Sequence, residues 1–403
     1  MTAALQGVRV VEMGGWMAAP GAGAMMADLG ADVIKVEPLH GDAMRGATRM
    51  PHGDAVPRID ANFLHDNRGK RGIAVAVNKP AGAELVRRLV AGADVFLCNL
   101  LPRRQAKYGL DSASLLAVNP RLVHATLTGY GVTGPDVDRP GYDITAYFGR
   151  GGLIHTMTEP GGLAPRLRPA AGDHPASLAL LSAVLAALRL AEQTGSGQVV
   201  DVSLLATAAW TMASDLAPTL VDGQDPPAGG RRTRPHALHG AFKTADDRWV
   251  LLFMPEPHWW PLFCEAVGRP LWVSDARFAT FEARKQYMFE LTAEMDELFA
   301  QRPLSQWAQL LDTHGFIWGP GATVAEFASD PQAEQIGLFP TVETSVGPIR
   351  TVRAPLSIAG ADARPRGPAP ELGQHTAEVL TELGLSADDL SALAADKVIG
   401  QTR

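Results

Sequence analysis

Strand-like runs of β-branched and apolar residues alternate with helical patterns along the first 130 residues of this chain. The strand-like runs occur at 7–13 (GVRVVEM), 31–37 (ADVIKVE), 72–77 (GIAVAV), 94–98 (DVFLC) and 121–131 (RLVHATLTGYG). Between them, residues 18–30 and 79–93 have the composition and spacing of helices. Strands separated by helices of this length are typical of a parallel sheet with helices on both faces. The sequence therefore predicts an α/β fold.

The length of 403 residues suggests two domains, because single hydrophobic cores rarely grow so large. Composition changes at 223–235, where GQDPPAGGRRTRP is rich in Pro, Gly and Arg, as linkers often are. We predict a large α/β domain interrupted by a smaller α+β domain. The predicted boundaries are 1–222 for the first part of the large domain, 223–235 for the linker, 236–335 for the small domain and 336–403 for the return to the large domain.

Charge and composition argue against several classes of protein. The formal net charge of −7 leaves no broad basic surface for nucleic acid, so any bound phosphate should meet a local basic cluster. The N-terminus lacks the basic and apolar segments of a signal peptide. The longest apolar stretch, 176–191, is interrupted by Ser182 and Arg189 and is too short to span a bilayer. We expect a cytoplasmic protein with no nucleic-acid or membrane partner.

Metal sites and nucleotide triphosphate sites also lack their sequence signatures. The two cysteines, Cys98 and Cys264, form no CxxC pair, and the histidines show no i,i+4 pairing on a helical pattern. No GxxxxGK[ST] segment is present. We therefore predict no metal and no dependence on ATP.

Asp173 is the most informative candidate for chemistry. It follows Gly172 and comes directly before the clearest helical pattern, 174–193, in which Pro175 lies in the first turn. The first-turn amides and the helix dipole favour an ionised carboxylate at this place. An Asp at a helix start is also a common N-cap, so the local pattern alone leaves both a structural and a catalytic role open.

Several segments in order resemble CoA-transferase family III, the formyl-CoA transferase-like and carnitine CoA-transferase-like enzymes. The matching segments are 7–45, 67–75 (NRGKRGIAV), 119–135 (NPRLVHATLTGYGVTGP), 140–147 (PGYDITAY), 170–177 (AAGDHPAS) and 194–205 (TGSGQVVDVSLL). The resemblance implies a large Rossmann-like domain that binds CoA and a smaller α+β domain. It also implies an interlinked homodimer, with active sites near the interface between the large domain of one chain and the small domain of the other.

The resemblance implies a mechanism in which Asp173 is the nucleophile. Its carboxylate would attack an acyl-CoA thioester to give a mixed anhydride, and exchange would proceed by way of an aspartyl-CoA thioester. Such a covalent intermediate splits one difficult step into easier ones and conserves the thioester energy. The partners would be an acyl-CoA donor and a carboxylic acid acceptor, with CoA a substrate and not a permanently bound cofactor.

Other site residues are carried over from the same resemblance. The candidates for binding CoA are Arg45, Asn67, Lys70, Arg71, Asn99, Arg104 and Lys107. The candidates for the acyl site are Met17, Tyr142 and Glu256. A solvated basic face is the alternative for the cations, and ordinary packing is the alternative for Met17 and Tyr142.

Two other functions stay open on the sequence. The superfamily also contains α-methylacyl-CoA racemases, whose catalytic histidine position is Tyr142 here, while Glu256 matches a racemase-type glutamate. A free tyrosine titrates near 10, which suits a general base poorly. A non-catalytic CoA-binding subunit of a hetero-oligomer is the second alternative, although such a subunit would not need Asp173.

Overall fold

A computed structural model describes residues 2–46, 60–226, 230, 234 and 236–400, and part of the predicted linker therefore lies outside the described residues. The chain forms two compact units. The first contains Met1–Leu153, Arg166–Ala217 and Glu334–Arg403, and the second contains Ile154–Pro165 and Pro218–Ala333. The segment 154–165, which the sequence analysis assigned to the large domain, thus clusters with the second unit.

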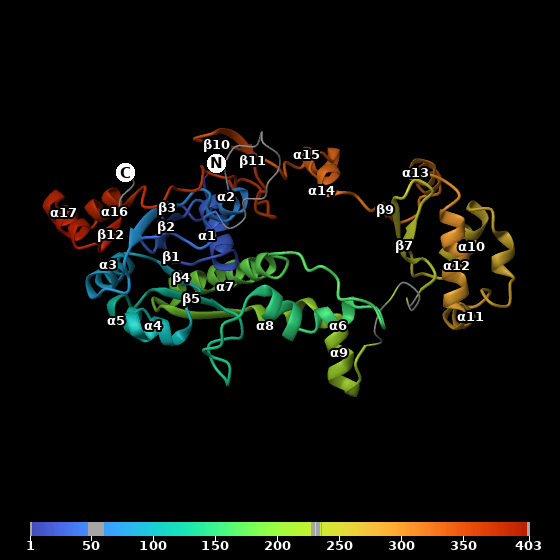
Figure 1. Ribbon diagram of the computed structural model, residues 1–403, viewed down its shortest axis with the longest axis horizontal. Helices are drawn as coiled ribbons and strands as arrows, with labels where there is room; N and C mark the ends of the chain where they lie inside the picture. Colours follow the sequence, from blue (N-terminus) through green and yellow to red (C-terminus); the bar gives the residue numbers. More distant parts are fainter. Residues whose placement is uncertain (1, 47–59, 227–229, 231–233, 235, 401–403) are drawn as a thin grey trace. The chain divides into compact units, whose positions relative to one another are not determined.

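The first unit is built on a seven-stranded sheet with the order β12-β3-β2-β1-β4-β5-β6 (Figure 1). The strands are β1 (Arg9–Met13), β2 (Asp32–Glu37), β3 (Arg71–Val75), β4 (Val95–Cys98), β5 (Val123–Thr128), β6 (Gln198–Ser203) and β12 (Ile399–Gly400). Every pair is parallel except β12 with β3. The central strands are buried on both faces, which explains their continuous apolar sequences. The predicted α/β fold is confirmed.

Helices cover both faces of this sheet, as predicted. One face packs against α1 (Ala18–Asp28), α7 (Asp173–Thr194) and α8 (Leu204–Thr211). The other packs against α3 (Pro80–Ala91), α5 (Ser112–Val118), α16 (Thr376–Glu382) and α17 (Ala387–Ala395). The remaining elements of this unit are α2 (Ala61–Asn67), α4 (Pro102–Tyr108), the π-helix η1 (Asp143–Arg150) and the hairpin of β10 (Thr341–Thr344) and β11 (Gly347–Arg350).

Helix α7 carries Asp173 as its first residue. Among the described residues, it is the one helix whose length and composition would allow it to cross a membrane. Ala176, Leu180, Leu181 and Val184 on its inner side are buried in the core of the sheet domain. Helix α7 is therefore a core helix.

The second unit has its own aromatic core. Its sheet consists of β7 (His239–Lys243), β8 (Trp249–Phe253) and β9 (Trp318–Pro320), all antiparallel. Its helices are α6 (Leu153–Met157, at the boundary), α10 (Trp259–Ala266), η2 (Pro270–Val273), α11 (Phe281–Gln286), α12 (Met288–Phe299), α13 (Leu304–Thr313), α14 (Val324–Phe327) and α15 (Pro331–Gln335, also at the boundary). Helix α9 (Ala213–Asp222) spans the boundary between the units.

Candidate active site

The first unit contains a cavity of about 890 Å³ at the carboxyl ends of its parallel strands. The loops after β1, β2, β3, β4 and β5 line it, and Asp173 contributes from the start of α7. The strand order reverses between β1 and β4, which places the cavity at the switch point where open α/β sheets bind their ligands.

Asp173 lies at the wall of this cavity without a role in capping its helix. The N-cap residue of α7 is Gly172, and no side chain makes a capping hydrogen bond there. The backbone is fixed by close packing, because a Cβ on Gly172 would lie 2.5 Å from Cγ of Tyr147. The single hydroxyl proton of Ser177 is shared between the carbonyl oxygens of Ala18, at 2.6 Å, and Asp173, at 3.0 Å. The fold therefore fixes the position of this carboxylate without a capping hydrogen bond from it.

The environment of Asp173 disfavours its charged form. Burial raises the pKa of its carboxyl from the usual 3.8 to about 7, and the nearby Asp143 carboxylate adds to the rise, as Asp66 does more weakly. His174 opposes the rise. Perturbed carboxyl groups at the wall of a cavity are frequent at catalytic sites.

An aromatic pair lines the same cavity. Trp16 and Tyr142 meet edge to face with ring centroids 5.6 Å apart, and they are 40% and 56% exposed. Tyr142, predicted for the acyl site, thus shares the cavity with Asp173. Met17 points elsewhere: it is buried in a small apolar cluster with Met44 and is not among the cavity-lining residues.

Two of the residues predicted to bind CoA line the cavity, Asn99 and Arg104. Asn99 accepts a hydrogen bond from the backbone of Gly15 at 3.1 Å and donates to its carbonyl oxygen at 2.7 Å. It therefore holds the loop after β1 in place. Lys107, one helical turn from Arg104, is not a lining residue.

The other predicted CoA ligands are engaged within the protein and do not line the cavity. Lys70 is fully buried and forms an ion pair with Glu12 at 2.6 Å. Asn67 is buried as well, and its side-chain oxygen accepts a hydrogen bond from Lys70. Arg45 pairs with a buried glutamate of β2, and Arg71 pairs with one carboxylate of β2 and two of α16.

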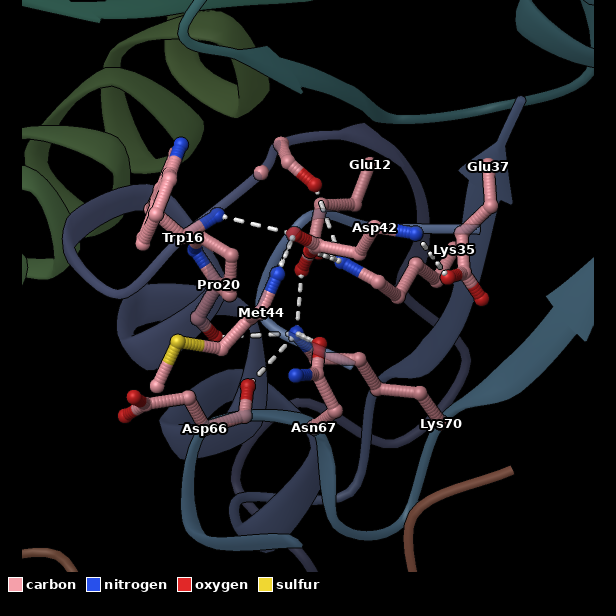
Figure 2. Close-up of polar contacts among 12 residues, drawn as sticks. Glu12, Trp16, Pro20, Lys35, Glu37, Asp42, Met44, Asp66, Asn67 and Lys70 are labelled. Carbon is pink, nitrogen blue, oxygen red and sulfur yellow. Dashed lines mark hydrogen bonds and ion pairs between the residues drawn. The ribbon is translucent and has the colours of Figure 1, made fainter. Parts of the chain in front are cut away.

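A buried ionic network supports the loop that carries Trp16 (Figure 2). Lys35 Nζ donates to Gly14 O and to Asp42 Oδ2, both at 2.9 Å, and to Glu12 at 3.3 Å. Asp42 Oδ1 in turn accepts the backbone N–H of Trp16 at 3.1 Å. Trp16 has a φ of 63°, a conformation that costs energy for a residue with a large side chain. The network therefore holds Trp16 in a strained position beside Tyr142.

The cavity also contains basic residues that the sequence analysis missed. Lys79 and Lys397 line it, and Lys79 Nζ donates to the carbonyl oxygen of Asp396 at 2.6 Å. Neither Arg104 nor Lys397 forms an ion pair with any residue that the structure describes. Lys397 belongs to the segment before β12, far along the chain, so no local pattern could have indicated it.

Glu256, the third candidate for the acyl site, belongs to the second unit. It lies in the turn before α10, where its carboxylate accepts a hydrogen bond from Nε1 of Trp259 at 3.1 Å.

One group of described residues has the spacing of metal ligands: His65, Asp66 and His174, whose ligating atoms lie within 4.8 Å of one another. Nδ1 of His65, however, lies 3.3 Å from a guanidinium nitrogen of Arg68. An Nδ1 that accepts this hydrogen bond leaves the proton of a neutral imidazole on Nε2, the nitrogen that faces Asp66. This arrangement opposes a cation there.

Comparisons with known proteins agree with one another. The family model described as CoA-transferase family III matches residues 5–376. The chain is 32% identical to (R)-2-hydroxy-4-methylpentanoate CoA-transferase of Clostridioides difficile, over 98% of this chain and 99% of that protein. It is 34% identical to succinate–glutarate CoA-transferase of Agrobacterium fabrum, over 94% and 95%. The crystal structure of a CAIB/BAIF family protein from Brucella suis aligns with a TM-score of 0.85 at 32% identity, covering 95% of this chain and 100% of that one.

Proposed function

The chain belongs to CoA-transferase family III, and from this premise we propose that Asp173 is the carboxylate that receives the acyl group. Enzymes of this family move CoA between acyl-CoA thioesters and carboxylic acids. The observation that supports Asp173 most directly is its place at the cavity wall with no capping hydrogen bond. A carboxylate that is partly buried, makes no capping hydrogen bond and faces a cavity is best explained by its chemistry.

The reaction then runs through covalent intermediates on Asp173. Its carboxylate oxygen attacks the thioester carbonyl and the C–S bond breaks. The products are a mixed anhydride on Asp173 and free CoA thiolate. The thiolate attacks the aspartyl carbonyl, which releases the donor acid and leaves an aspartyl-CoA thioester. The acceptor carboxylate displaces the thiolate to form a second anhydride. The thiolate then attacks the acceptor carbonyl, so that the new CoA ester forms and the Asp173 carboxylate is restored.

The phosphates of CoA are proposed to meet Arg104, Lys79 and Lys397. All three line the cavity that contains Asp173. Arginine offers a planar pair of donors to a phosphate, and lysine offers a point charge. Lys70 and Arg71, by contrast, already neutralise carboxylates of the protein, so their recruitment would leave those carboxylates unpaired.

The acyl group is proposed to contact Trp16 and Tyr142. Their exposed rings lie beside each other on the cavity wall, and aromatic faces bind apolar groups well. This favours an acid with a hydrocarbon or aromatic chain over a very small acid such as formate. Both curated relatives carry the names of transferases, which favours transfer over the racemase reaction and over a non-catalytic subunit.

The protein is proposed to act as a homodimer in the cytoplasm. The exposed side of the apolar core helix α7 carries Leu178 and Leu190, which are 37% and 44% exposed. Trp210 at the end of α8 is 83% exposed, and α9 has no buried residue. Large apolar side chains left exposed are frequent at interfaces. A second copy of the chain, interlinked as the family resemblance implies, would cover it.

The test of the nucleophile is chemical trapping. The enzyme is mixed with an acyl-CoA and then with hydroxylamine, which converts anhydrides and thioesters to hydroxamates and leaves free carboxylates unchanged. Mass spectrometry of peptides should find the hydroxamate on Asp173 only, and the Asp173→Asn variant should give none. A hydroxamate on a different carboxylate, or CoA transfer by Asp173→Asn, would contradict the proposal. The same mixtures, run with a panel of acids, identify donor and acceptor from the CoA esters formed.

A further inference from the structure

A buried carboxylate with no assigned role lies within hydrogen-bond distance of His174, the residue that follows Asp173. Asp66, the penultimate residue of α2, is 1% exposed. Its Oδ1 is 3.3 Å from Nε2 of His174, and its Oδ2 has no hydrogen-bond partner among the described residues. A buried carboxylate costs several kcal/mol unless a cation or donors compensate it. The identity of its compensating cation therefore matters to the whole site.

His65 does not supply that cation. Burial lowers the pKa of His65 to about 4, and the Arg68 guanidinium contributes to the lowering. Arg68 itself is committed to Asp28, at 2.6 Å. Lys70 also faces Asp66 and donates to its backbone carbonyl oxygen at 2.8 Å, but its ion pair is with Glu12, at 2.6 Å. His174 remains, and its hydrogen bond to Asp66 raises the pKa of its imidazole. Its ring lies edge to face against that of His65, with centroids 5.3 Å apart.

The chain fixes His174 beside the proposed nucleophile, since the two are consecutive residues in the first turn of α7. The backbone N–H of His174 donates to Ala170 O at 3.0 Å, and Ser177 Oγ holds this turn to α1 through Ala18 O at 2.6 Å. The turn is therefore rigid at the point where it presents both side chains.

On this geometry we propose that His174, held as an imidazolium by Asp66, is a positioning residue that keeps Asp173 ionised and ready to attack the thioester. The inference rests on the proposed function, because it assigns a partner to the nucleophile. His174 does not touch the reacting atoms in this role. It neutralises Asp66, which would otherwise stand as a second unpaired carboxylate near Asp173.

The charges around the site give the direction of the effect. Asp173 faces Asp143 from η1, Asp66 from α2 and His174 on its own helix. His174 faces Asp66, Arg68 and the neutral His65. Asp66 also faces the buried Lys70, which Glu12 already neutralises. With His174 charged, one cation opposes two carboxylates. Without it, both carboxylates act on Asp173 with no opposition, so its pKa rises further and a smaller fraction is ionised at neutral pH.

The test compares the pH dependence of single-turnover acylation in four forms of the enzyme: wild type, His174→Gln, His174→Arg, and His174→Gln combined with Asp66→Asn. His174→Gln should move the acidic limb of the pH–rate profile to higher pH. The acylation rate at pH 6 should fall about tenfold, with little change at pH 9. His174→Arg keeps a cation and should keep the wild-type limb. The double variant removes the uncompensated carboxylate and should restore the limb.

Each outcome bears on the proposal. A His174→Gln profile that coincides with wild type overturns it, and so does an equal loss of rate at every pH. Failure of Asp66→Asn to rescue His174→Gln, with both proteins folded by circular dichroism, also overturns it. If His174→Gln does not fold, His174→Asn takes its place. The proposal is then supported when the pH–rate profile of His174→Asn is shifted to higher pH and that of His174→Arg coincides with wild type. Activity lost to a chelator and restored by Zn²⁺ would replace it with a metal site.

Asp173→Asn, assayed beside these forms, tests the nucleophile separately. CoA transfer by Asp173→Asn would contradict the proposed function itself. An inactive Asp173→Asn together with an unshifted pH–rate profile of His174→Gln would contradict only the role of His174.

Discussion

Replacing Asp173 with Asn should abolish CoA transfer and at the same time stabilise the protein. The amide cannot form the anhydride, so we expect the rate to fall by a factor on the order of 10⁴ or more. The wild-type carboxylate makes no capping hydrogen bond that the variant would lose. What the variant loses is a charge that burial and Asp143 disfavour.

The magnitude follows from the pKa of Asp173. A rise from 3.8 to about 7, at 1.36 kcal/mol per pH unit, corresponds to an upper limit of about 4 kcal/mol. The side chain is partly exposed, and a partly buried amide needs hydrogen bonds of its own, so we expect a gain of about 2 kcal/mol. Because the folded-state pKa of this acid is raised, the wild type loses stability as the pH rises from about 4 to about 7. The variant's advantage should therefore be absent near pH 3.5 and complete above pH 8.

Hydrogen exchange measured by mass spectrometry on peptides from α7 reports the stability of this unit without mixing it with that of the second unit. Asp201→Asn is the control for the same chemical change elsewhere in this unit, because Asp201 is an exposed residue of β6 away from the lining of the cavity. The control should keep its activity. An Asp173→Asn variant that exchanges faster than wild type at pH 8 would refute the reasoning, since it would show that the carboxylate stabilises the fold.

Three further predictions concern binding, packing and assembly. Lys79→Ala should weaken CoA binding in calorimetry with little loss of stability. Lys70→Ala should instead lower the free energy of unfolding by about 3–5 kcal/mol, because it leaves the buried Glu12 unpaired. Equal losses of CoA affinity in the two variants would contradict these separate roles. Gly23→Ala should prevent folding or destabilise the protein severely, because its Cβ would lie 1.9 Å from Oε2 of Glu12. Gly92→Ala, whose Cβ meets nothing within 4 Å, should melt at the wild-type temperature. Light scattering should show a dimer that Trp210→Asp weakens, and a wild-type monomer at micromolar concentration would oppose the assembly.

The sequence was sufficient to predict the sheet and the position of Asp173. The continuous apolar strands and the helices between them determine an α/β fold, and a carboxylate directly before a long apolar helix is visible as a local pattern. The edge strand β12 was not predictable in this way. It has only two residues, Ile399 and Gly400, and it exists because it pairs with β3.

The predicted CoA ligands stay predictions, and they show what a sequence pattern alone cannot distinguish. A lysine after a strand looks the same whether it meets a phosphate or a buried carboxylate. Glu12 and Lys35 occupy directly paired positions on β1 and β2, and Lys70 reaches the same glutamate from the residue before β3. Only the pairing of the strands reveals these contacts. One signal was available: a Glu and a Lys inside otherwise apolar strands already suggest a buried ion pair.

The order in which the chain is synthesised bears on how this enzyme matures. Strand β3 leaves the ribosome early, but its edge stays open until His375, Thr376 and then β12 follow roughly 300 to 320 residues later, which takes about 15–65 s at about 5–20 residues per second. The second unit is complete before then, since its last segment ends at Ala333. An open strand edge invites pairing with other chains during this interval. Lys397 emerges in the same late segment, so a nascent chain acquires its full cavity only after nearly all of its other residues have been made.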